Sequence, residues 1–122
     1  MNVTVIERSG IRVAEVTAEA PVITDAASVM ELIMTVRYET GASRIVMDKA
    51  LVCREFFILS TQLAGEILQK CSNYRIKLAI YGDYSGYTSK PLHDFIYESN
   101  LGNDFFFVSA REETLEQLFA AG

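Results

Sequence analysis

Two stretches near the start of the chain carry the alternating pattern of β-strands. Residues 2–7 and 11–16 are rich in β-branched side chains, and Arg8, Ser9 and Gly10 separate them. Gly10 tolerates the positive φ that a tight turn between antiparallel strands requires. The pattern therefore predicts an N-terminal β-hairpin.

Helical and extended patterns alternate after the hairpin. Apolar residues recur at helical spacing in four segments, and each segment begins near a residue that caps helices well. Ser109, with Glu112 three residues later, has the spacing of a capping box. Short apolar runs between the helical segments predict strands. We expect helices over 25–39, from Ser60–Thr61 to a left-handed Asn73, from Ser89 to about residue 101 and after Ser109, with strands over 44–47, 75–81 and 105–108.

These elements define an α/β fold with the order β-β-α-β-α-β-α-β-α. Strands joined by a helix usually run parallel in one sheet, so we expect a mixed sheet whose last three strands are parallel. The chain of 122 residues has no repeat or low-complexity tract that would mark a linker. We therefore expect residues 1–122 to form a single domain.

Charge and the apolar pattern argue against two classes of partner. The formal net charge is −5, and the 11 basic residues are scattered among 16 acidic ones. No basic stripe is present that could neutralise a phosphate backbone, which argues against nucleic acid. The first residues lack the features of a secretory signal, and no apolar run reaches the ~18 residues of a membrane span. We expect a cytoplasmic protein that does not bind membranes.

The chain offers few groups for metal or redox chemistry. Cys53, Cys71 and His93 do not have the spacing of zinc ligands, and we expect no metal and no cofactor. In a reducing compartment both cysteines are expected to pack as small apolar side chains. His93 falls on the polar side of its helix, and a solvent-exposed histidine is the default interpretation.

Several blocks of the sequence carry a family resemblance. They are 56–70, Asn73–Tyr74, Gly82–Ser85, Ser89–Lys90 and Asp94–Asn100. Together they resemble the domain-of-unknown-function family 4180, over roughly residues 24–119. That family has no established activity to carry over, and Gln62 stands where it usually has glycine.

The hairpin followed by alternating helices and strands also resembles the STAS domains, the fold of bacterial anti-sigma-factor antagonists. STAS domains place a phosphorylatable serine at the start of the helix after the third strand. Ser60 and Thr61 fall in the corresponding place, so the resemblance marks them as candidate phosphorylation sites. The Asp-Ser-Ser-Gly type of sequence around that serine is absent here.

Polar side chains follow the predicted parallel strands. The carboxyl ends of such strands meet at one edge of the sheet, and the next helices begin there, with free N–H groups that suit an anion. We take this edge as the candidate binding rim. Alternatively, the hydroxyls only cap helices, each contributing about 1 kcal/mol. The candidate rim residues are Ser60, Thr61, Asp83, Ser85, Ser89 and Lys90.

The apolar run Phe56–Leu59 allows two interpretations, because such a run either closes a core or forms a partner surface. Tyr81, Tyr84 and Tyr87 near the rim favour an interface. Because the STAS resemblance implies a role in bacterial regulation, we expect a non-enzymatic regulatory module of the bacterial cytosol that binds a protein partner. The alternatives are a domain that binds a small molecule or anion, with weak enzymatic activity through Asp83, Ser85 and Lys90, and a structural homodimer. A deep pocket at the rim containing a bound anion would favour the ligand, and a flat rim with exposed Tyr and Phe the protein partner.

Overall fold

A five-stranded mixed sheet forms the centre of the molecule. The computed structural model describes residues 1–122. The strands lie in the order β1-β2-β3-β4-β5, with β1 antiparallel to β2 and the other neighbours parallel. Their bounds are β1 Asn2–Arg8, β2 Ile11–Thr17, β3 Arg44–Asp48, β4 Lys77–Tyr81 and β5 Phe105–Val108. This confirms the predicted hairpin, α/β class and element order, including three parallel strands at the end.

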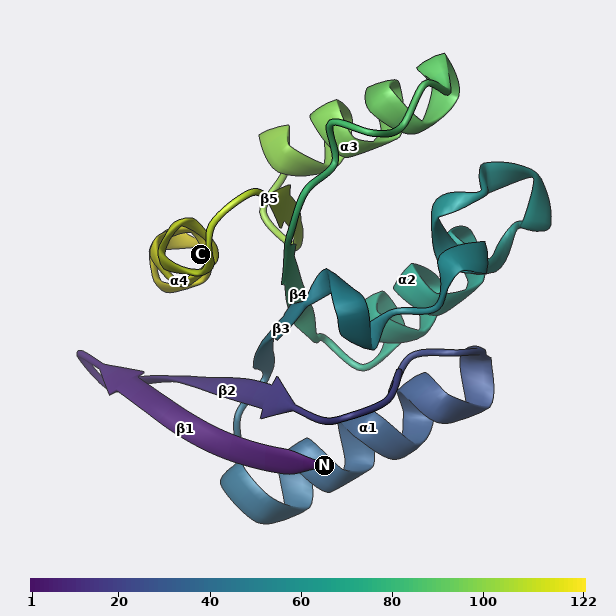
Figure 1. Cartoon of the computed structure of the whole chain (residues 1–122). Helices are drawn as coiled ribbons and strands as arrows, with labels where there is room; N and C mark the ends of the chain where they lie inside the picture. The colour runs from purple at the N-terminus through teal and green to yellow at the C-terminus, as the bar shows by residue number, and fades with distance from the viewer.

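Four helices cover the two faces of the sheet unequally. Figure 1 shows α1, α2 and α3 on one side and α4 alone on the other. The helices span α1 Ala26–Thr40, α2 Leu63–Asn73, α3 Lys90–Leu101 and α4 Arg111–Ala120. None of them is long and apolar enough to cross a bilayer.

Each face of the sheet has its own core. The larger cluster holds 23 buried residues, among them Ile33 of α1, Ile67 of α2 and Leu92 of α3. The smaller cluster of seven places Leu115 and Leu118 of α4 against the opposite face. Adjacent residues on β4 and β5 therefore point into different cores, which explains the unbroken apolar run of β5.

The first and third helices begin and end as their sequences predict. The Asp25 side chain caps α1 by accepting from the Ser28 N–H, and Gly41 ends that helix with a φ of 69°. The Ser89 hydroxyl accepts a hydrogen bond from the Leu92 N–H, with Pro91 in the first turn of α3. These local signals require no tertiary information because each contact spans at most four residues.

The start of α2 differs from the prediction. Ser60 and Thr61 belong to a short 3-10 turn, and α2 begins only at Leu63 after a left-handed Gln62 with a φ of 64°. The turn forms because the Ile58 carbonyl accepts from the Thr61 N–H, as in 3-10 geometry. Three such turns, η1 Lys49–Leu51, η2 Arg54–Phe57 and η3 Leu59–Thr61, fill the segment between β3 and α2.

Two other helix ends also differ. Asn73 is the last helical residue of α2, and the left-handed position falls on Arg75, with a φ of 56°. The predicted capping box of α4 is wrong because the helix begins one residue later, with Ala110 at the cap position. The Ser109 hydroxyl donates instead to the Glu113 carboxylate.

The three 3-10 turns are tied to the segment that precedes α1. Residues Ile23 and Val52 form an isolated parallel bridge, and the Cys53 N–H donates to the Ile23 carbonyl over 2.9 Å. Phe56 and Phe57 then point into the larger core, where they are 0% and 4% exposed. The turns are thereby held over the carboxyl ends of β3 and β4.

Candidate functional site

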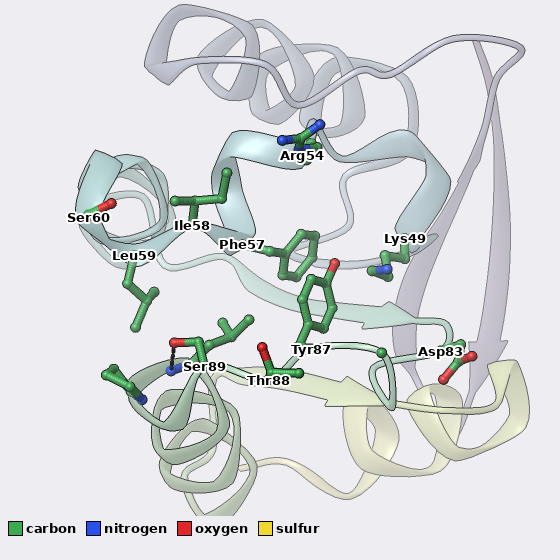
Figure 2. Close-up of a pocket in the computed structure, with 13 residues that line it drawn as sticks. Lys49, Arg54, Phe57, Ile58, Leu59, Ser60, Asp83, Tyr87, Thr88 and Ser89 are labelled. Atoms are coloured by element: carbon green, nitrogen blue, oxygen red, sulfur yellow. Dashed lines mark hydrogen bonds between the residues drawn. The ribbon is translucent and has the colours of Figure 1, made fainter.

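A groove of about 990 Å³ opens at the carboxyl-terminal edge of the sheet. One wall is formed by the 3-10 turns after β3, and the other by the loop after β4 and the start of α3 (Figure 2). We call this hollow the rim groove. It is lined by Lys49, Arg54, Phe57, Ile58, Leu59, Ser60, Asp83, Gly86, Tyr87, Thr88, Ser89, Pro91 and Leu92.

A cluster of aromatic rings lies in the middle of the rim groove. The Phe57 and Tyr87 rings are stacked, with centroids 5.6 Å apart and planes inclined by 28°. Tyr84 packs 5.8 Å from Phe57, and its hydroxyl donates to the Ile80 carbonyl over 2.7 Å. Burial raises the pKa of Tyr84 well above its ordinary value, so the hydroxyl remains a donor. The loop after β4 is thereby anchored to its own strand.

The Lys49 ammonium group lies over these rings. Its Nζ atom is 4.6 Å from the ring centre of Tyr87, 5.6 Å from that of Phe57 and 5.7 Å from that of Tyr84. Such distances are typical of cation–π attraction. Lys49 takes part in none of the five ion pairs of the structure. Its positive charge is held in place by rings and is left without a bonded counter-ion.

Gly82 allows Lys49 to pack this closely against the end of β4. A Cβ atom at Gly82 would lie 2.7 Å from the Cβ and 3.1 Å from the Cδ of Lys49. Real side chains essentially never approach to 2.7 Å, and the Cβ of Lys49 is fixed to the backbone. A glycine is therefore needed where β4 passes the Lys49 stem.

Arg54 provides the second positive charge. It is exposed, and its side chain forms neither a hydrogen bond nor an ion pair within the chain. Figure 2 shows it above the Phe57 and Tyr87 rings, with Lys49 to one side and Leu59 toward the other. The rim groove thus has a cationic part next to the rings and an apolar part around Ile58, Leu59 and Leu92.

The carboxylate of Asp83 is occupied by a local turn. It accepts from the Ser85 hydroxyl over 2.6 Å and from the Ser85 N–H over 2.9 Å. These two bonds, with a smaller contribution from the charge of Lys49, lower the pKa of Asp83. Asp83 is ionised at neutral pH and orders the loop that carries Tyr87.

The six predicted rim residues divide into two groups. Ser60, Asp83 and Ser89 line the rim groove, although Figure 2 shows Ser60 and Asp83 at opposite ends. Thr61, Ser85 and Lys90 do not line it. The parallel strands bring the segments that carry these six residues to one edge of the sheet, as expected. Within each segment, however, only some of the side chains point into the rim groove.

Thr61 and Lys90, which do not line the rim groove, have local bonding partners. The Thr61 hydroxyl has the Glu55 and Ile58 carbonyls within 2.8 Å as acceptors, and it accepts from the Leu63 N–H. Lys90 forms an ion pair of 2.7 Å with Asp94, one helical turn away. Of the two candidate phosphorylation sites, Ser60 is exposed without a hydrogen bond from its hydroxyl, whereas the Thr61 hydroxyl is engaged.

Sequence reasoning missed Arg54 and did not include Lys49 among the six candidate rim residues. Both lie in the irregular segment after β3, where no periodicity indicates side-chain direction. The neighbouring apolar run 56–59 was the sequence feature that could have pointed to this segment. Phe56 and Phe57 are core residues, as the first interpretation expects, while Ile58, 39% exposed, and Leu59 line the groove. The partner surface stays a prediction.

The polar and titratable groups near the rim groove have local contacts. The only histidine, His93, is exposed on α3, where its Nε2 atom contacts the Tyr87 carbonyl and no serine or cysteine. Ser89 is occupied as a helix cap. No three His, Cys, Asp or Glu side chains gather where they could hold a metal ion. Apolar walls with two cations can hold an organic ligand with a negative group.

Comparison with known proteins identifies a family and no close relative of known activity. No curated protein and no solved structure matches the chain. One family model matches residues 8–118, which leaves out only the first seven and the last four residues. The chain therefore belongs to the family described as Domain of unknown function (DUF4180).

Proposed function

We propose that this chain is a non-enzymatic module that binds a small organic ligand in the rim groove. One observation carries the proposal: Lys49 and Arg54, neither paired with a carboxylate, line a groove of about 990 Å³ beside stacked aromatic rings. Ligand pockets of proteins commonly measure ~300–1,000 Å³ and combine apolar walls with a few polar groups. The rim groove matches that description.

Binding is favoured over catalysis by the state of the polar groups. General acid–base chemistry requires a group within hydrogen-bond reach of a nucleophile, usually oriented by a third residue. Asp83 is instead bonded to Ser85. Lys90, which does not line the rim groove, is bonded to Asp94. The weak enzyme built from Asp83, Ser85 and Lys90 is therefore the less favoured form of the ligand hypothesis.

A second candidate is a regulatory module of the bacterial cytosol, STAS-like in architecture, that binds a protein partner at the same edge. The observation in its favour is Ile58, a large apolar side chain that is 39% exposed next to Leu59. Exposed apolar residues that lie together often mark partner surfaces. The rim is hollowed rather than flat, so we place the small ligand first.

Two-dimensional NMR with a fragment library tests the proposal. Ligands should shift the amide signals of residues lining the rim groove, such as Lys49, Tyr87 and Thr88. A smaller hollow of about 270 Å³ at the opposite end of the sheet, near Arg12 and Arg44, serves as the internal control. A library that shifts no groove signals, or that shifts mainly the signals around Arg12 and Arg44, would argue against the proposal.

A further inference from the structure

The rim groove meets a second hollow at its cationic part. This adjoining hollow measures about 390 Å³ and shares five lining residues with the rim groove: Lys49, Arg54, Phe57, Asp83 and Tyr87. These five residues therefore border open space on two sides. Lys49 and Arg54 are thus among the residues that line both hollows.

Building on the proposed function, we propose that the preferred ligand is a monocarboxylate with an apolar body. Its carboxylate lies at Lys49 and Arg54, and its apolar body extends toward Ile58, Leu59 and Leu92. The two cations supply charge-assisted hydrogen bonds, and the planar guanidinium group of Arg54 matches a carboxylate with two parallel bonds.

The charges around the cationic part select a single negative charge. Lys49 and Arg54 contribute two positive charges to the rim groove, and Asp83 contributes one negative charge, so the sum is +1. Asp48 adds another carboxylate in the adjoining hollow. A dianionic phosphate would meet these two carboxylates, and like charges at close range cost affinity. A monoanion meets less of this repulsion than a dianion does.

The environment of Lys49 makes its charge effective in binding. The lysine is half-buried against three rings, and the close approach of Gly82 limits the movement of its stem. A cation that is already held in place loses less side-chain entropy when a ligand binds. Lys90, by contrast, has a side chain that is 84% exposed and is paired with Asp94.

A matched set of compounds and variants tests the charge preference. The probes are 4-phenylbutyrate, the neutral 4-phenyl-1-butanol and phenyl phosphate, titrated into the whole chain at pH 8 and followed by NMR. We expect 4-phenylbutyrate to bind at least about tenfold more tightly than either other compound. Lys49→Met and Arg54→Met should each weaken its binding about fivefold to tenfold and leave the alcohol unchanged. Lys90→Met is the matched control and should bind like the wild type.

The outcomes separate this inference from the proposed function. Equal binding of acid and alcohol, tighter binding of phenyl phosphate, or an equal loss in Lys90→Met would overturn the monocarboxylate preference while ligand binding at the rim groove stands. Failure of every probe and of the fragment library to shift groove signals would overturn both. Thermal melts confirm that each variant is folded, and Arg54→Met, at an exposed position, keeps the test valid if Lys49→Met fails to fold.

Discussion

Arg111, the first residue of α4, holds Glu15 of β2 by two hydrogen bonds, one to each carboxylate oxygen, although 96 residues separate the two in sequence. The Glu15 side chain is 16% exposed and that of Arg111 is 40% exposed, so water screens the pair only in part. The pair connects the start of the last helix to the second strand. It therefore fixes how α4 lies across its face of the sheet.

The ion pair gives a pH-dependent contribution to stability. The bonds from Arg111 lower the pKa of Glu15 below its ordinary value of 4.5. A carboxylate with a lowered pKa in the folded state stabilises the fold above its unfolded pKa, and this contribution is lost as the pH falls through the folded pKa. We expect Glu15→Gln to lower the free energy of unfolding by about 1–2 kcal/mol at pH 7. The difference from wild type should shrink as the pH falls from 7 through the lowered pKa of Glu15.

Urea denaturation of both proteins across this pH range measures the effect. Glu7→Gln is the control, because Glu7 and Arg12 form a pair of 3.7 Å in which both side chains are about half exposed. That substitution should change stability by less than ~0.5 kcal/mol at any pH. A Glu15→Gln deficit that is the same at low and neutral pH would contradict the assigned role of the carboxylate charge.

The packing of Gly82 against Lys49 predicts a position-specific cost for alanine. Gly82→Ala places a Cβ 2.7 Å from that of Lys49, so one strand end must move. We expect a loss of about 1–3 kcal/mol, as in other overpacked sites, and displaced NMR signals around Lys49. Gly86 is the matched control, because it lies four residues further along the chain and a Cβ there would meet nothing within 4 Å. Comparable losses in both variants would mean that the close approach is not the cause.

The two sides of α2 predict unequal effects of neighbouring substitutions. Ile67 is 0% exposed in the larger core, whereas the adjacent Glu66 is exposed. Ile67→Ala removes buried methyl groups and leaves a cavity, so we expect a loss of about 2–4 kcal/mol. Glu66→Ala should cost less than ~1 kcal/mol. Chemical denaturation compares the two, and similar losses would show that the faces of the helix are wrongly assigned.

The two cysteines should differ in reactivity toward thiol reagents. Cys71 is 1% exposed, and burial raises its pKa to about 12, so almost no thiolate forms at pH 8. Cys53 is only half-buried, with a weak bond from its thiol to the Thr24 carbonyl. In a Cys53→Ser variant we expect labelling by a disulfide reagent only on unfolding by denaturant. Rapid labelling of that variant in the native state would refute the burial of Cys71.

The sequence by itself determined the elements and most of their ends. Alternation and helical spacing depend on which side chains share a face, and caps such as Asp25, Gly41 and Ser89 act on groups within a few residues. Parallel pairing of strands that are joined by helices follows from chain connectivity. These properties are local or topological, and so the α/β class and the order of elements could be predicted. The same reasoning brought Ser60, Asp83 and Ser89 to one edge of the sheet.

Only the tertiary structure decided which side chains meet at that edge. Arg54 enters the rim groove because three 3-10 turns, tied to Ile23, set its direction, and no periodicity in the sequence encodes that path. The left-handed Gln62 likewise delays the start of α2 beyond Ser60 and Thr61. The pairing of Glu15 with Arg111 requires both the strand order and the placement of α4 on the opposite face from the other helices. Such contacts depend on the packing of the whole chain, because residues distant in sequence meet only after the sheet and its two cores have formed.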